Sequence, residues 1–151
     1  MFVGQNAGKT EEAINFYANI FDKNKIVAIS RYEEGEPDQT GFIKYSQFEL
    51  QGLPFGAMDS SANHQFNFNE AVSFIITVDT QEEIDYYWNK LLEGGKAGKC
   101  GWIKDKYGIS WQVVPSILGK MMTNPETAPK ATYAFLQMSK FIIADLEAAV
   151  K

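Results

Sequence analysis

Few side chains in this sequence are of the types that usually carry out chemistry. Among its 151 residues the chain has one histidine, His64, and one cysteine, Cys100. A single cysteine excludes an internal disulfide and a zinc site built from several cysteines. We expect His64 to be a solvated loop residue. We expect Cys100 to be a small buried residue of a strand, because a reactive thiol would need a histidine or a cationic group beside it.

The glutamine of the segment ISWQVV is the polar side chain that most needs an explanation. Side chains of a strand point alternately to its two faces. Gln112 therefore shares a small, partly polar face with Ser110, whereas Trp111 occupies the bulky face that suits a core. In residues 71–78, Ser73 falls on a corresponding small face. A face of this kind suits a cavity, where Ser73 and Gln112 would orient a ligand by hydrogen bonds.

The charge and the hydropathy pattern exclude several classes of function. The formal charge is −5 and basic residues do not cluster, which argues against a nucleic acid or an anionic membrane as partner. No apolar run approaches the roughly 20 residues of a membrane span, and the N-terminus lacks a signal-peptide pattern. With 45% apolar residues, the chain is expected to fold as a globular, cytoplasmic protein.

Hydrophobic spacing predicts the elements that would position these side chains. Helices are expected at about residues 9–21 and 80–93. We expect Thr10 to cap the first helix and Gly94 to end the second. Asp105 to Gly108 read as a turn between two strands of the segment 100–115. The remaining expected elements are strands at 26–32, 42–50, 53–58 and 71–78, and a helical tail at 116–151.

An internal repeat connects the two predicted helices. The segments TEEAINFYAN and TQEEIDYYWN align without a gap at an offset of 70 positions, from Thr10 to Thr80. A helix that recurs with the same apolar face, each time between a strand and a run of strands, indicates two copies of one packing unit. We therefore predict an α+β fold of two βαβββ modules, at about residues 1–60 and 71–115, within a single domain of residues 1–151.

Several segments resemble one known family. They are EEAINFY, FELQGLPF, FNFNEAVSF, EEIDYYWNKLLEGG and CGWIKDKYGISWQVVP. These segments resemble the PhnB-like branch of the vicinal oxygen chelate superfamily, which includes glyoxalase I, extradiol dioxygenases and bleomycin-resistance proteins. The branch carries the label 3-demethylubiquinone-9 3-methyltransferase. The resemblance covers residues 2–115 densely and implies that the two modules form a curved mixed sheet with an open cleft.

Catalytic members of this superfamily hold a divalent metal in the cleft with His, Glu or Gln side chains. Two of the metal-ligand positions match Ser73 and Gln112, a third falls by a looser alignment at Met58, and the fourth lies ahead of Met1. One amide, one hydroxyl and one thioether are a poor ligand set for a divalent cation, which needs about three converging nitrogen or oxygen donors. We therefore expect no bound metal and no other cofactor.

The methyltransferase label has no support in the sequence, which lacks a Gly-rich strand-to-helix turn followed by an acidic residue. Three functions stay open. The first is metal-free binding of a small molecule, with Ser73 and Gln112 as polar contacts and Met58 and Trp102 as apolar contacts. The second is a metal-dependent lyase, isomerase or dioxygenase completed by a residue elsewhere. The third is a non-catalytic homodimeric module, with a seam covered by tail side chains: Met121, Met122, Phe135 and Met138.

Overall fold

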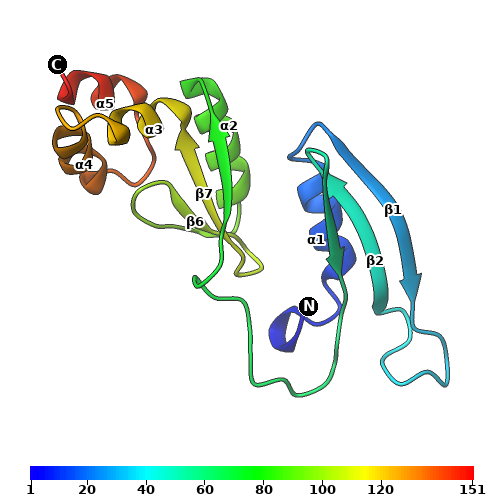
Figure 1. The fold of residues 1–151 in the computed structure, drawn as a ribbon. Coiled ribbons are helices and arrows are strands. Elements are labelled where there is room, and N and C mark those ends of the chain that lie inside the picture. The colour runs from blue at the N-terminus through cyan, green and yellow to red at the C-terminus, as the bar shows by residue number, and fades with distance from the viewer. The chain divides into compact units, whose positions relative to one another are not determined.

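The computed structural model describes residues 1–151 as two compact units, Met1–Asn67 and Phe68–Lys151 (Figure 1). Unit one contains the first predicted module, and unit two contains the second module with the helical tail. Each unit has its own sheet. The predicted α+β class, with two modules and C-terminal helices, is confirmed. The grouping of both modules into one domain with a shared cleft stays a prediction.

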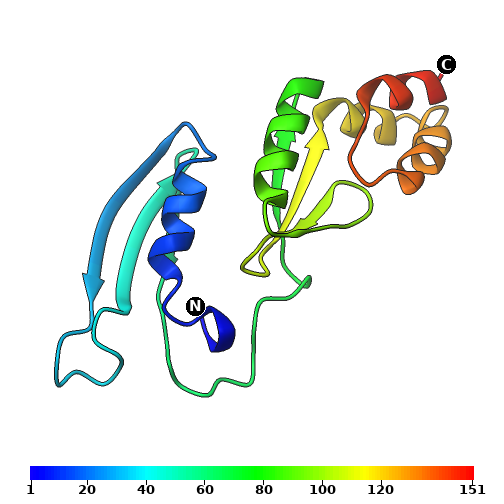
Figure 2. The same cartoon turned by 180° about the vertical axis from the view of Figure 1, so that it is seen from behind.

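Unit one is a three-stranded antiparallel sheet with a helix on one face. The strands β1 (Asn24–Arg31), β2 (Ile43–Leu50) and β3 (Leu53–Ala57) lie in that order. A short 3-10 helix, η1 (Gly4–Asn6), precedes helix α1 (Thr10–Ala18), which covers the sheet (Figure 2). Gln51 and Gly52 join β2 to β3 with φ values of 51° and 79°, as a tight two-residue hairpin turn requires. Phe2 forms an isolated parallel bridge with Asp59, which completes the βαβββ order.

The start of α1 differs from the prediction. Lys9 rather than Thr10 is the N-cap residue, and it makes no side-chain capping bond. The buried carboxylate of Asp59 takes over this role, because its Oδ1 accepts hydrogen bonds from the Gly8 amide at 2.9 Å, the Thr10 amide at 3.1 Å and the Thr10 hydroxyl at 2.7 Å. Its Oδ2 accepts from the Ile43 amide at 2.9 Å. Thr10 thus belongs to the first turn as a donor, and Asp59 ties the helix to β2.

Unit two repeats the βαβββ order, with a full strand, β4 (Phe74–Val78), at the place where unit one has only the bridge of Phe2. Its strands follow the order β4, β7 (Ser110–Pro115), β6 (Trp102–Lys104) and β5 (Lys96–Ala97), and β4 runs parallel to β7. Helix α2 (Gln81–Leu92) covers one face of this sheet (Figure 2). It starts with a capping box between Thr80 and Glu83 and ends before Gly94, whose φ is 72°. The helix therefore begins and ends close to where its sequence signals predict.

Two details of unit two correct the sequence reading. The strand expected at 71–78 begins only at Phe74, so Ser73 lies just before it. Cys100 lies in a turn with φ 54° rather than in a strand. It is only partly buried, and its Sγ lies 3.6 Å from the Phe135 carbonyl oxygen. The neighbouring Gly101 admits no side chain, because a Cβ there would meet the Phe141 ring at 2.6 Å.

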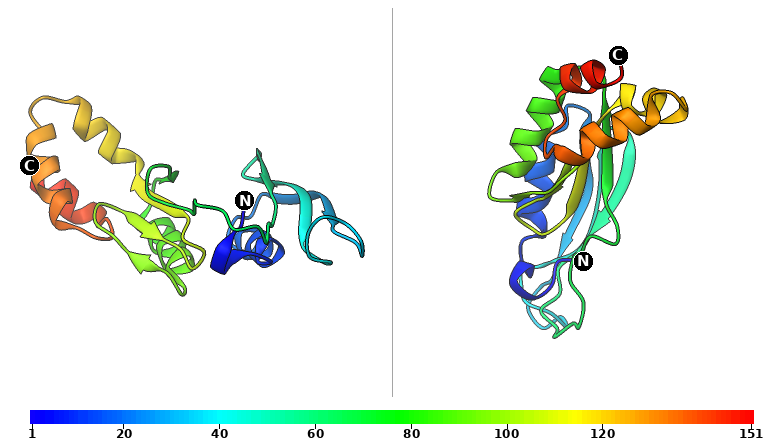
Figure 3. Two further views of the ribbon diagram at one scale, coloured as in Figure 1. Left: turned by 90° about the horizontal axis from the view of Figure 1, so that it is seen from below. Right: turned by 90° about the vertical axis from the view of Figure 1, so that its left-hand side faces the viewer.

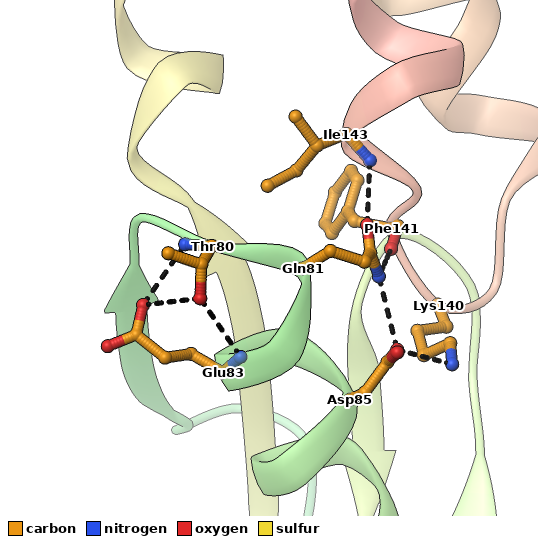
Figure 4. Close-up of polar contacts among 7 residues, drawn as sticks. All are labelled: Thr80, Gln81, Glu83, Asp85, Lys140, Phe141 and Ile143. Carbon is orange, nitrogen blue, oxygen red and sulfur yellow. Dashed lines mark hydrogen bonds and ion pairs between the residues drawn. The ribbon is translucent and has the colours of Figure 1, made fainter.

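Three helices form the tail: α3 (Ser116–Thr123), α4 (Ala128–Gln137) and α5 (Ile143–Ala149) (Figure 3). A polar cluster at the start of α2 anchors the segment between α4 and α5 (Figure 4). The Gln81 amide donates to the Phe141 carbonyl at 3.2 Å and to Asp85 Oδ1 at 3.1 Å, and its Oε1 accepts from the Ile143 amide at 2.9 Å. Lys140 Nζ lies 2.6 Å from Asp85 Oδ1. The tail is therefore an integral part of unit two.

Candidate functional site

The sheet of unit two has one face that α2 does not cover. Trp111 and Val113 are buried on the α2 side, at 4% and 0% exposure. The alternate side chains lie on the other face, which we call the open face. Cross-strand register arranges it in two rows, and its members are Lys96, Lys104 and Ser110 in the first row and Trp102, Gln112 and Ile75 in the second.

Gln112 and Ser73 meet on this face, as the alternation of the two strands predicts. The Gln112 side-chain nitrogen donates to Ser73 Oγ over 2.8 Å, and both residues are half-buried. The bond links β7 to the residue just before β4. It leaves the Gln112 Oε1 as an acceptor and the Ser73 hydroxyl proton as a donor. The glutamine in an apolar strand is thus a polar contact on the open face.

A pocket of about 260 Å³ lies in this sheet, lined by Trp102, the cross-strand neighbour of Gln112, but not by Gln112 or Ser73 themselves. Its wall includes Trp102 and a charged pair, Lys104 and Glu70, whose side-chain nitrogen and carboxylate are in contact. The hydrogen bond from Lys104 holds the pKa of the Glu70 carboxyl below its ordinary value. Ser110 also lines the pocket, is 2% exposed, and has a hydroxyl group without a hydrogen-bond partner. The open face therefore offers an indole ring, a hydroxyl and several charges around one hollow.

The turn that precedes β7 holds a second polar group, Asp105, whose role is structural. Its Oδ1 accepts from the amides of Tyr107 and Ile109 at 2.9 and 3.0 Å. Its Oδ2 accepts from the Trp111 indole nitrogen at 2.9 Å. Asp105 is only 4% exposed, and these three donors use both carboxylate oxygens. The aspartate therefore orients the hairpin and the buried tryptophan.

The other candidate residues, Met58 and His64, belong to unit one, as does Arg31. Met58 follows β3 in unit one, is 36% exposed, and stays an expected apolar contact. His64 lies in the loop after β3, where its Nε2 is 2.9 Å from Ser60 Oγ. Arg31 pairs with Glu11 of α1 at 2.6 Å, so its side chain reaches the helix. A larger hollow of about 530 Å³ lies on the tail, away from the sheet, and is lined by Pro129, Lys130, Tyr133 and Ala149.

The open face of unit two does not carry the side chains of an ordinary metal site. No group of three or more His, Cys, Asp or Glu residues comes together in the structure. Gln112 supplies one amide oxygen there, and its neighbour Ser73 supplies a hydroxyl. The nearby Glu70 carboxylate is engaged by Lys104. These donors do not fit a divalent cation that needs several converging ligands.

The sequence analysis did not name Lys104 or Glu70, and it placed Ser110 on the face of Gln112 without proposing it as a contact. Lys104 and Ser110 could have been proposed, because they lie two positions from Trp102 and Gln112 and so share their face. Glu70 gave no such signal, since it lies 34 positions before Lys104 and outside any strand. Its approach to Lys104 depends on how the chain enters β4.

Comparison with known proteins identifies the family. The model of the family described as 3-demethylubiquinone-9 3-methyltransferase matches residues 1–114. The chain belongs to this family. It is 41% identical to the PhnB protein from Bacillus cereus, over 73% of this chain and 93% of that chain, with a TM-score of 0.69. The prediction of a PhnB-like protein, from the branch labelled 3-demethylubiquinone-9 3-methyltransferase, is confirmed.

Two more distant structures share the fold of this PhnB-like protein. Protein PA1353 from Pseudomonas aeruginosa is 18% identical over 76% of this chain and 92% of that chain, with a TM-score of 0.61. The fosfomycin resistance protein FosX from Mesorhizobium loti is 12% identical over 82% of this chain and 93% of that chain, with a TM-score of 0.55. At these identities the likeness shows the fold alone. No curated protein matches the sequence.

The family description names a methyltransferase, which would need an adenosyl cofactor. Such cofactors bind where a Gly-rich turn leads from a strand into a helix N-terminus. In this PhnB-like protein the turn from β4 to α2 is Asp79-Thr80, without glycine. The Glu83 amide bonds to Thr80, and the Glu83 carboxylate accepts from the amides of Asp79 and Thr80. This turn therefore does not fit the cofactor.

None of the helices combines the length and the apolar composition that crossing a membrane requires.

Proposed function

We propose that this PhnB-like protein binds a small molecule on the open face of unit two, without a catalytic metal. The observation that carries the proposal is the pocket of about 260 Å³ lined by Trp102, which is the cross-strand neighbour of Gln112. Binding sites typically combine an apolar wall with a few placed polar groups. Trp102 supplies the apolar wall, and Ser73 and Gln112, on the same face, supply a donor and an acceptor to the same ligand.

The proposal is tested by removing one contact at a time. Saturation-transfer NMR against a library of small acids, amides and aromatic compounds reports binding without knowledge of the natural ligand. We expect Trp102→Ala and Gln112→Ala to fold but to lose most of the signals that the unchanged protein gives. Tyr133→Ala is the control, because Tyr133 lies in the tail hollow and is 75% exposed. Binding that survives Trp102→Ala and disappears with Tyr133→Ala would contradict the proposal.

The metal-free part of the proposal has its own test. Dialysis against a chelator is expected to leave fragment binding unchanged, because the proposed contacts are hydrogen bonds and an indole ring. Elemental analysis of protein purified without chelators should find less than about a tenth of an equivalent of zinc, nickel, manganese or iron per chain. Stoichiometric metal that is lost in Gln112→Ala would instead support a metal-dependent lyase, isomerase or dioxygenase.

We also propose that the protein is a cytoplasmic homodimer. An exposed apolar edge supports this, since β4 is an outer strand of its sheet and Ile75 is 62% exposed. Val72, just before the strand, is 73% exposed. Edges of this kind pair readily with other strands, and proteins usually cover them.

A further inference from the structure

The pocket on the open face carries an imbalance of charge. Lys96 and Lys104 are directly opposite each other on β5 and β6. Like charges in this position destabilise a sheet. Glu70 pairs with Lys104, and no acidic group pairs with Lys96. Because the Lys104 and Glu70 side chains are 39% and 58% exposed, this ion pair is the weak kind that solvent competes with. One positive charge is therefore left at the pocket.

The row of Lys96 and Lys104 ends at Ser110, whose hydroxyl group makes no hydrogen bond. Ser110 is directly opposite Lys104, is 2% exposed and lines the pocket, yet its Oγ has no hydrogen-bond partner. Buried polar groups are nearly always paired, because leaving one unpaired costs free energy. Ser110 therefore points to a ligand atom that completes its hydrogen bonding.

The rest of the pocket wall suits a compact apolar group. Trp102 lies one row from the lysines, two residues before Lys104. Gly98 packs against it so closely that a Cβ there would be 3.0 Å from the Trp102 Cβ. Glycine at position 98 is therefore what allows this close approach, and both residues line the pocket. An apolar group of the ligand can stack there beside the charged row.

We propose that the pocket binds the anionic group, a carboxylate or a phosphate, of the small molecule. This inference rests on the proposed function and specifies the ligand class. The ammonium groups of Lys96 and Lys104 and the Ser110 hydroxyl are the donors, and Trp102 contacts the apolar part. Charge-assisted hydrogen bonds to an anion are stronger than neutral ones. Glu70 competes with the ligand for Lys104, so it lowers the affinity of the free pocket.

The test is specific because removing the charge of Lys104 and removing the charge of Glu70 are expected to change the affinity for an anion in opposite directions. Benzoate, benzamide and inorganic phosphate are titrated at low salt, with the Trp102 and Ser110 resonances as the readout. We expect benzoate to bind about tenfold more tightly than benzamide, its neutral counterpart. Lys104→Gln and Ser110→Ala should weaken benzoate binding by a similar factor. Glu70→Gln should tighten it by about threefold. Lys90→Gln on α2 is the control and should change nothing, since Lys90 pairs with Glu93.

Competition between inorganic phosphate and benzoate distinguishes a phosphate ligand from a carboxylate ligand. Phosphate that displaces benzoate supports a phosphate ligand, whereas benzoate binding without competition supports a carboxylate. Equal binding of benzoate and benzamide, or weaker binding in Glu70→Gln, would overturn the anion assignment while leaving small-molecule binding in place. A complete lack of response at Trp102 and Ser110 to all compounds, benzamide included, would instead count against the proposed function itself.

Discussion

The carboxylate of Asp105 illustrates how a single residue serves the fold rather than the chemistry. It collects two turn amides and the indole nitrogen of Trp111 inside unit two. All three donors sit in or next to the buried hairpin, where water cannot replace the lost acceptor. A buried donor that loses its partner retains the full cost of its desolvation.

We predict that Asp105→Ala destabilises the protein by about 3 kcal/mol, because it leaves several buried donors unpaired. Urea unfolding followed by tryptophan fluorescence measures this free energy of unfolding. Asp22→Ala is a matched control, since Asp22 is exposed, and a change within about 0.5 kcal/mol is expected for it. Equal stability of the two variants would show that the aspartate is dispensable.

At the residue scale, the sequence predicted the face of the sheet on which a side chain lies better than it predicted the residue that the side chain contacts. The period-two alternation of β7 placed Gln112 and Ser73 on one face, and they are joined by a hydrogen bond. It could not reveal that Asp59 would cap α1, because that aspartate lies 49 positions from Thr10. The pairing of Glu70 with Lys104 is equally non-local. Contacts between distant segments depend on the packed chain and leave no local pattern.

At the scale of elements, the start of α2 organises the tail. Gln81 and Asp85 lie four residues apart, one turn along the helix, and share hydrogen bonds on one side. They hold the segment from Lys140 to Ile143 between α4 and α5. The tail of this chain therefore depends on two polar side chains of the module as well as on its own apolar residues.

The tail anchor is expected to weaken in acid. The hydrogen bonds from Lys140, foremost, and from Gln81 lower the pKa of the Asp85 carboxyl in the folded protein. A lowered pKa means that the anchor contributes fully above the ordinary carboxyl value of about 3.9 and is lost as the pH falls through the lowered value. Hydrogen exchange at the Ile143 amide, which donates to Gln81, should show less protection in acid than at neutral pH.

Asp85→Asn is the matched variant for this prediction. It should reduce the protection of Ile143 at neutral pH and remove most of its dependence on acid. The Ala131 amide, which donates to Thr127 within the tail at 2.8 Å, is an internal reference that should keep its protection. Identical Ile143 protection in both proteins at every pH would show that Asp85 does not anchor the tail.

At the scale of the whole molecule, the internal repeat was the strongest signal in the sequence. It predicted one topology twice. In unit two β4 pairs in parallel with β7, and in unit one Phe2 forms a parallel bridge with Asp59, just after β3. The two helix starts nevertheless differ, with a capping box at Thr80 and the distant Asp59 at α1. Repetition of the apolar pattern therefore preserved the packing of the modules but not their polar details.

The proposed homodimer is a property of the whole chain. Sedimentation velocity at micromolar concentration is expected to give about twice the chain mass of 17.0 kDa. Val72→Lys, which adds a charge beside the exposed edge of β4, should shift the protein toward monomer. A monomer for the unchanged sequence would remove the dimer from this account, whereas the proposed pocket belongs to unit two alone.

The most direct test of the central claim is to locate the binding site residue by residue. Amide and indole correlation spectra of the labelled protein are recorded while small acids, amides and aromatic compounds are added. We predict that the largest shifts occur at Trp102, Lys104, Ser110 and Gln112, and that they persist after dialysis against a chelator. Shifts centred on Tyr133 and Ala149 in the tail hollow, or no shifts on the open face with any compound, would contradict the claim.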